Sequence, residues 1–121
     1  MLDVNTKRDD SSNILVLTFR GEFDIVHRDI IDSYLTEAIS KLPRALIIDL
    51  SDISLIDSSG IGILIAHHAK LKSTGIRMAL VVNHNNNLIE KLERIGVFSD
   101  IGIDSYKTLD EAMSSLANLN Q

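Results

Sequence analysis

The chain has 121 residues and a mass of 13.4 kDa, the size of one domain with one hydrophobic core. Its 45% hydrophobic and 24% charged residues are typical of globular proteins and exclude intrinsic disorder and low-complexity architectures. A net charge of −5 argues against direct binding to nucleic acid, which needs an excess of cations, and the lack of cysteine excludes disulfides and zinc–thiolate sites.

The first half of the chain predicts a hairpin, a helix and a buried strand. A short strand near Leu2–Lys7 and an apolar, β-prone segment over Ile14–Phe19 flank turn-forming residues at 9–13. Apolar side chains then follow helical spacing from about Asp29 to Leu42, where the chain's only proline ends the pattern. Ala45–Leu50 is almost continuously apolar, which is typical of a central parallel strand covered on both faces.

The second half predicts alternating helices and strands. We first expect a helix that begins at Ser58 and Ser59 and is closed by Gly75, followed by a strand over Met78–Val82 and a turn at 83–87. A short helix over Leu88–Ile95, ended by Gly96, and a weak strand near Ile101–Ile103 come next. The last helix follows a Thr108–Glu111 capping box and reaches Leu119. The order ββαβαβαβα predicts an α/β fold: a single domain over residues 1–121, with an opening β-hairpin, a mostly parallel (mixed) sheet of four to five strands, and four helices.

The segment with most chemical interest is Ile56–Gly62, at the end of a predicted strand and the start of a helix, where open α/β sheets place functional groups. Its simplest role is helix capping. Gly60 and Gly62 each cost up to about 1 kcal/mol relative to alanine inside a helix, which suggests close approach by a strand or a partner. A serine hydroxyl there could also accept a phosphoryl group, which the helix dipole would favour and Asp57 would oppose. The segment is a candidate charge switch.

Several catalytic and ligand-binding interpretations fail on spacing. Ser58 lacks the glycine two residues earlier that a nucleophile elbow needs, and His68 lies about 15 Å further along the helix axis. The His67–His68 pair lacks the i, i+4 spacing of a zinc helix, so we expect an exposed His67, a boundary His68 and no metal site. No complete dinucleotide or P-loop fingerprint occurs. We therefore expect no catalytic residue and no cofactor, and a protein that is not an enzyme.

A competing interpretation is a receiver-like switch phosphorylated on an aspartate, because Asp49, Asp52 and Asp57 cluster in and after the apolar strand. A receiver also needs an acidic pair after its first parallel strand and a lysine after a late one. The acids after Ile14–Phe19 fit that pattern poorly, and Lys107 lies well beyond the weak strand. Turn and cap chemistry accounts for Asp49 and Asp52.

Three segments together resemble the STAS domain of the bacterial anti-sigma factor antagonists. They are Gly21–Asp24 (GEFD), Leu46–Ser51 (LIIDLS) and Ile56–Gly62 (IDSSGIG), and Leu92–Phe98 is similar to the family's third helix and the turn after it. The resemblance covers nearly the whole chain, and residues 57–62 are its most specific part. It implies that Ser58, the serine directly after the aspartate, is phosphorylated by an anti-sigma factor that is also a serine kinase.

The resemblance implies regulation of transcription by partner switching. The unphosphorylated antagonist would bind the anti-sigma factor, the phosphorylated form would be released, and a metal-dependent serine phosphatase would reset it. The partner contacts that carry over are Asp24, Asp57, Ser58, Ser59 and Gly60. Other STAS domains are scaffolds or transporter components without phosphorylation, and that alternative stays open.

One departure from the family lies beside the expected contacts. Ile25–Arg28 is bulkier and more charged than the small residues that often follow the aspartate at this point in the family, which leaves the partner's identity open. No apolar segment reaches the roughly 18 residues of a membrane span, and the first residues lack the apolar stretch of a signal peptide. We expect a cytoplasmic protein with no membrane span, present as a monomer or weak dimer.

Overall fold

The computed structural model describes residues 1–83 and 86–117. In chain order its elements are β1 (Leu2–Asp9), β2 (Ile14–Phe23), the short 3-10 helix η1 (Ile25–His27), α1 (Arg28–Ser40), β3 (Ala45–Ile56), α2 (Ser58–Leu71), β4 (Arg77–Val81), α3 (Asn86–Ile95), β5 (Asp104–Tyr106) and α4 (Leu109–Ala117). Apart from η1, which the sequence did not predict, this is the predicted order of strands and helices.

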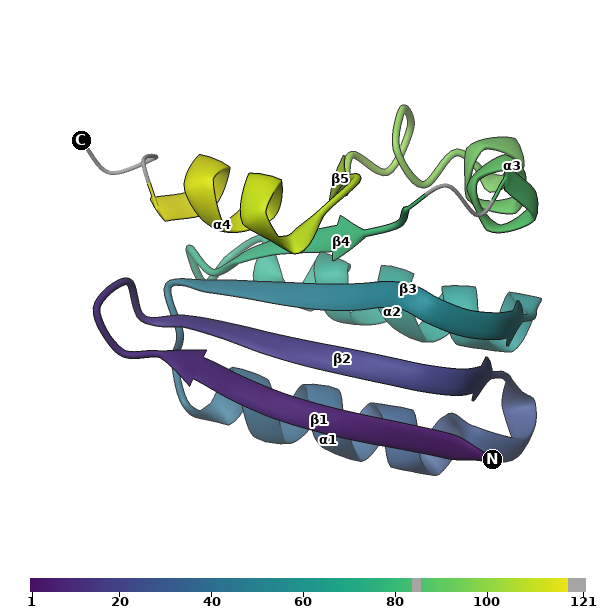
Figure 1. Cartoon of the computed structure of the whole chain (residues 1–121), viewed down its shortest axis with the longest axis horizontal. Helices are drawn as coiled ribbons and strands as arrows, with labels where there is room; N and C mark the ends of the chain where they lie inside the picture. The colour runs from purple at the N-terminus through teal and green to yellow at the C-terminus, as the bar shows by residue number, and fades with distance from the viewer. Residues whose placement is uncertain (84–85, 118–121) are drawn as a thin grey trace.

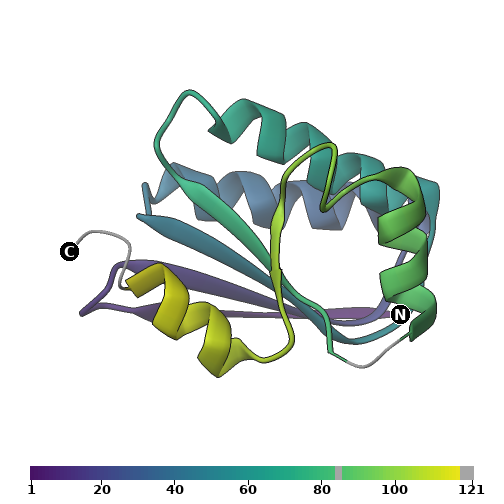
Figure 2. The same ribbon diagram turned by 90° about the horizontal axis from the view of Figure 1, so that it is seen from above.

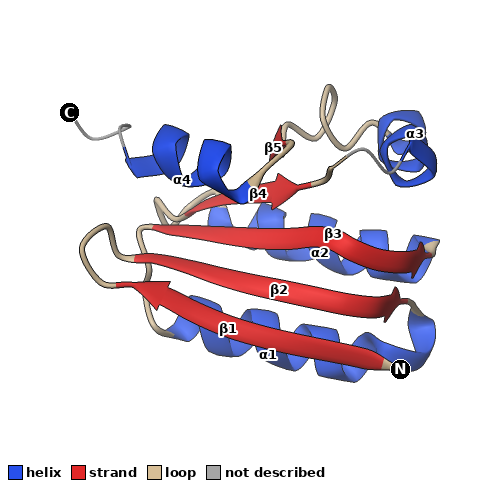
Figure 3. Ribbon diagram, viewed as in Figure 1, coloured by secondary structure: helices blue, strands red, loops and turns tan. Residues whose placement is uncertain are grey.

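The strands form one five-stranded sheet in the order β1-β2-β3-β4-β5 (Figures 1 and 3). β1 and β2 are antiparallel and form the expected hairpin, whereas β2, β3, β4 and β5 pair in parallel. The prediction of a mixed, mostly parallel α/β sheet with an opening hairpin is confirmed. The parallel strands carry their carboxyl ends to the same edge of the sheet, the edge at which α2 begins.

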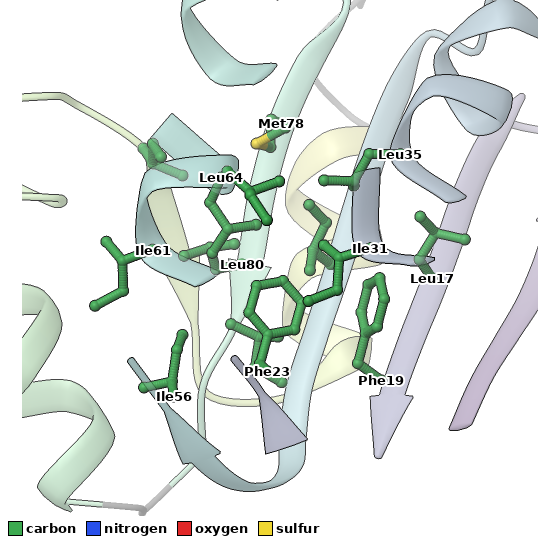
Figure 4. Close-up of a cluster of buried hydrophobic side chains, with 14 of the residues drawn as sticks. Leu17, Phe19, Phe23, Ile31, Leu35, Ile56, Ile61, Leu64, Met78 and Leu80 are labelled. Atoms are coloured by element: carbon green, nitrogen blue, oxygen red, sulfur yellow. The ribbon is translucent and has the colours of Figure 1, made fainter. Parts of the chain in front are cut away.

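Helices cover both faces of the sheet unequally, as Figure 2 shows: α1 and α2 lie over one face and α4 over the other. The larger hydrophobic core lies under α1 and α2, and includes Leu88 and Leu92 of α3. In Figure 4 the side chains of Phe23, Ile31 and Leu64 point toward one another inside this core. The smaller core lies between α4 and the apolar residues on the opposite face of β2, β3 and β4.

Two strands extend further than their apolar segments predicted. β2 continues past Phe19 to Phe23 and β3 continues past Leu50 to Ile56, although both extensions contain polar residues. The two strands pair along this length with register shifts on either side of Gly21, whose φ of +113° suits glycine. The segment between Leu50 and Asp57, which lies beyond the predicted strand Ala45–Leu50, is therefore mostly strand.

Other differences from the predictions are local. The last strand is Asp104–Tyr106 and not the expected Ile101–Ile103, because Ile103 is instead buried in the larger core just before the strand starts. α4 begins as predicted, with the Glu111 N–H donating to Thr108 Oγ1 over 3.1 Å. The expected end of this helix at Leu119 and the middle of the expected turn at 83–87 lie outside the described residues.

The prediction for one of the two adjacent histidines was wrong. His67, expected to be exposed, is buried, with 4% of its surface exposed, whereas His68 is half-buried, as expected of a boundary residue. α1 packs against α2 on this side, so His67 faces the neighbouring helix and its Nε2 lies 2.7 Å from Asp32 Oδ1. Burial raises the free energy of the charged imidazole of His68, and the nearby Lys72 adds to this effect, so the pKa of His68 is lowered.

Candidate functional site

The extended ends of β2 and β3 bring two distant parts of the chain together. Phe23 pairs with Ile56 at the carboxyl edge of the sheet, and the Asp57 N–H donates to the Phe23 carbonyl over 3.4 Å. Asp24, which follows Phe23, and Asp57, which follows Ile56, therefore lie on neighbouring strand ends. The two sequence-predicted acids of the site therefore lie beside the start of α2. Figure 1 shows the ends of β2 and β3 on the same side of the molecule as that helix start.

Asp57 is the N-cap of α2 and also holds the neighbouring loop. Its Oδ1 accepts a hydrogen bond from the Gly60 N–H over 3.0 Å, and its Oδ2 accepts one from the Ile25 N–H over 3.1 Å. The Gly60 N–H contributes most to lowering the pKa of Asp57, burial works in the opposite direction, and the N–H groups of Ile25 and Ser59 and the charge of Lys91 add to the lowering. Asp57 is therefore ionised at neutral pH, with both carboxylate oxygens engaged.

The two glycines in the first turns of α2 have different structural settings. A Cβ atom on Gly60 would lie 2.6 Å from Phe23 Cδ1 and closer still to the Phe23 carbonyl oxygen. The close approach expected at Gly60 is thus that of β2. Gly62 is exposed, and a Cβ atom there would meet nothing within 4 Å. Nothing within the described chain requires glycine at position 62.

The two adjacent serines also differ. Ser58 is the first residue of α2 and is exposed, whereas Ser59 is half-buried. Within residues 1–83 and 86–117, the Ser58 hydroxyl makes no hydrogen bond. Because Asp57 already provides the capping carboxylate, the Ser58 hydroxyl is left for solvent or for another molecule.

η1 presents a small apolar surface beside this serine. Asp24 Oδ1 lies 2.7 Å from His27 Nδ1, and both of these side chains are only 15% exposed. Ile25 and Val26, which lie between them, are 61% and 81% exposed. Asp24 was predicted as a contact, but the exposure of two aliphatic side chains in this turn was not predicted.

Lys91 of α3 reaches the same edge of the sheet. Its Nζ donates to the Ile56 carbonyl over 2.7 Å, and its charge is one of the causes that lower the pKa of Asp57. Lys91 was not predicted as a site residue, because it stands 29 to 35 residues after the residues of the Ile56–Gly62 motif, in an ordinary amphipathic helix.

The acids of the receiver interpretation are spread along β3 and the residue that follows it. Asp49 lies within the strand and accepts a hydrogen bond from the Ser51 N–H, and Asp52 pairs with Arg20 over 3.7 Å. Eight residues separate Asp49 from Asp57, which is about 26 Å along an extended strand. Among the described residues, no three His, Asp or Glu side chains are grouped so that they could hold a metal ion.

A family model for the STAS domain matches residues 5–112. The chain belongs to the STAS domain family. The predicted family resemblance is thereby confirmed at the level of the domain, over most of the chain's length. No helix in the described part of this STAS domain has the length and apolar character needed to cross a membrane.

Solved structures with the same fold include proteins of more than one kind. An anti-sigma factor antagonist from Mycobacterium paratuberculosis has a TM-score of 0.81 at 24% identity, with 98% of this chain and 96% of that chain covered. SpoIIAA of Bacillus, in its phosphorylated form, has a TM-score of 0.69 at 20% identity, covering 94% and 99%. A sulfate transporter family protein from Wolinella succinogenes has a TM-score of 0.73 at 19% identity, covering 86% and 84%.

Proposed function

We propose that this STAS domain is a non-enzymatic anti-sigma factor antagonist that regulates transcription by partner switching. The unphosphorylated protein binds an anti-sigma factor that is also a serine kinase. That kinase transfers the γ-phosphoryl group of ATP to Ser58 Oγ, releasing ADP and the hydroxyl proton, and the phosphorylated protein leaves the complex. A metal-dependent serine phosphatase hydrolyses the ester and restores the binding form.

The observation that carries this proposal is the exposed Ser58 hydroxyl at the first position of α2, which no hydrogen bond occupies within the described residues. A kinase must reach the acceptor oxygen, and Ser58 satisfies that requirement better than the half-buried Ser59. The engagement of both Asp57 oxygens by backbone N–H groups further supports it, because the carboxylate can hold the acceptor segment without itself blocking the hydroxyl.

The same geometry supports a contact surface around Ser58. The proposed partner-binding residues Asp24, Asp57, Ser58, Ser59 and Gly60 all lie at the ends of β2 and β3 or in the first turn of α2. A phosphate on Ser58 would add about −1.5 to −2 charges at the centre of this surface, next to the ionised Asp57. A partner packed closely around a neutral hydroxyl would then face uncompensated negative charge, which favours dissociation.

Similarity to SpoIIAA, which is an anti-sigma factor antagonist, and to the Mycobacterium antagonist supports the antagonist role. The Wolinella protein favours a second candidate, a STAS scaffold or transporter component that binds its partner without phosphorylation. The two candidates differ in a measurable way, because only the antagonist needs Ser58 to be modified.

The test is phosphorylation of the purified protein. Each candidate serine kinase of the anti-sigma type from the same genome is incubated with the protein and ATP, and the phosphate is mapped by mass spectrometry. We expect one acid-stable phosphate on Ser58, and none in a Ser58→Ala variant. Ser59→Ala is the matched control and should still be modified. An acid-labile phosphate on Asp49 would instead favour the receiver, and an unmodified protein bound to a permease would favour the transporter component.

A further inference from the structure

Lys91 holds a positive charge close to the proposed phosphorylation site. Its ammonium lies 2.7 Å from the carbonyl oxygen of Ile56, two residues before Ser58. Consecutive Cα atoms are about 3.8 Å apart, so Ile56 Cα and Ser58 Cα are separated by no more than about 7.6 Å. A phosphate on Ser58 would therefore lie within roughly two Debye lengths of this ammonium at physiological salt, and the partly buried position of the lysine reduces the screening between the two charges.

Phosphorylation would create a strongly negative cluster that needs a cation. The phosphate would stand beside Asp57, which is already ionised and fully engaged with backbone N–H groups. The N-terminal end of α2 favours negative charge but carries only about half a unit of positive charge. Lys91 already acts on the Asp57 carboxylate, since its charge contributes to lowering the pKa of that group.

We propose that Lys91 is the intramolecular counter-ion of phosphorylated Ser58, an inference that rests on the proposed function. An ammonium group has three N–H donors, so Lys91 can keep its bond to the Ile56 carbonyl and still donate to a phosphate oxygen. A hollow of about 270 Å³ lies beside it, between the end of β3 and α3, and is lined by Ile56, Leu88 and Lys91 among others. The flexible lysine stem has room to turn there.

The regulatory consequence is a larger difference between the phosphorylated and unphosphorylated forms in how strongly they bind the kinase. In the unphosphorylated form Lys91 ties α3 to the end of β3. In the phosphorylated form it also neutralises part of the phosphate, which stabilises the modified protein without help from a partner. The phosphorylated antagonist would then leave its kinase more readily, because the kinase's cations are no longer the only ones that match the phosphate.

The test uses protein carrying phosphoserine at position 58, installed during translation by genetic code expansion, so that it does not depend on any kinase. The second ionisation of the phosphate is followed by ³¹P NMR as a function of pH, in the parent and in Lys91→Met. We expect the phosphate pKa to rise in the variant by about 0.5 unit, or roughly a threefold gain in proton affinity. Lys91→Arg should restore the parent value.

Two controls separate this effect from others. Lys70→Met removes the same charge from α2 about 18 Å along the axis from Ser58 and should leave the phosphate pKa unchanged. Arg28→Met tests the cation at the start of α1. Equal pKa values in the parent and Lys91→Met would overturn the inference, as would an equal rise in Lys70→Met or a rise confined to Arg28→Met. Failure of every kinase to modify Ser58 would instead count against the proposed function alone.

Discussion

Asp57 and Ile25 are joined by a hydrogen bond of 3.1 Å, from the Ile25 N–H to Asp57 Oδ2, across 32 residues of sequence. The same carboxylate caps α2 through its other oxygen. One side chain therefore fixes both the start of the helix that carries Ser58 and the turn that exposes Ile25 and Val26. The candidate site is a consequence of this double role, because neither segment alone would place the serine beside an apolar surface.

The first prediction concerns this carboxylate. Asp57→Ala removes the cap of α2 and the acceptor of the Ile25 N–H, so we expect the free energy of unfolding at neutral pH to fall by about 1 kcal/mol or more. Urea unfolding of the parent and the variant measures the difference. Asp52→Ala is the control. It also removes one carboxylate, which forms an exposed ion pair with Arg20 at 3.7 Å, and it should lower the free energy of unfolding by less.

The contribution of Asp57 should also depend on pH with a definite sign. Because its pKa in the folded protein is below the ordinary value of 3.8, the ionised cap stabilises the fold fully above about that pH. The contribution is lost as the pH falls through the lower folded value. The gap between parent and Asp57→Ala should therefore shrink in acid. A gap that widens in acid would contradict the role of the ionised carboxylate.

The second prediction contrasts the two glycines of α2. Gly60→Ala places a Cβ atom against Phe23, so we expect a loss of about 1–3 kcal/mol in the free energy of unfolding. Gly62→Ala meets no neighbour within 4 Å and improves helix propensity, so it should raise that free energy by up to about 1 kcal/mol. Denaturant unfolding of both variants provides the comparison, and opposite signs are the expected result. A stabilising Gly60→Ala would show that β2 does not constrain this position.

The order of helices and strands could be predicted from the sequence better than the lengths of the strands. Hydrophobic periodicity identified the helices and the apolar halves of β2 and β3, because the buried positions of these segments are marked by apolar residues in the local sequence. The halves that build the site are polar and irregular, and they are strands only because each pairs with the other across the shifts near Gly21. Such pairing is a long-range property that local pattern cannot reveal.

The site residues divide in the same way. Asp57, Ser58 and Gly60 were identified from the motif, because helix caps and helical glycines have a local signature. Lys91 was missed because its role depends on where α3 docks. His67 was assigned to the surface because a short helix segment does not reveal which of two adjacent histidines will face α1.

The third prediction tests the contact between α1 and α2. His67 is buried, and its Nε2 lies 2.7 Å from Asp32 Oδ1. Asp32→Ala leaves that ring nitrogen without its partner, so we expect the free energy of unfolding to fall by about 1 kcal/mol. Asp29→Ala, which removes an exposed acid one turn earlier on the same helix, should have a smaller effect. A double-mutant cycle with His67→Leu should give a coupling of at least about 0.5 kcal/mol between positions 32 and 67, and additive losses would contradict the contact.

The fourth prediction concerns the switch itself and uses the kinase found in the phosphorylation assay. Ser58→Asp places a negative charge beside the ionised Asp57, so we expect binding to the anti-sigma factor to weaken by tenfold or more, equivalent to about 1.4 kcal/mol. Ser58→Ala should keep the affinity of the unphosphorylated parent, because the hydroxyl makes no hydrogen bond within the described chain. Isothermal titration calorimetry measures all three proteins. Ser59→Asp is the matched control for added charge at a neighbouring, half-buried position. Equal affinities for Ser58→Asp and Ser58→Ala would remove Ser58 as the switch even if the kinase modifies it, because phosphorylation there would then have no effect on the complex.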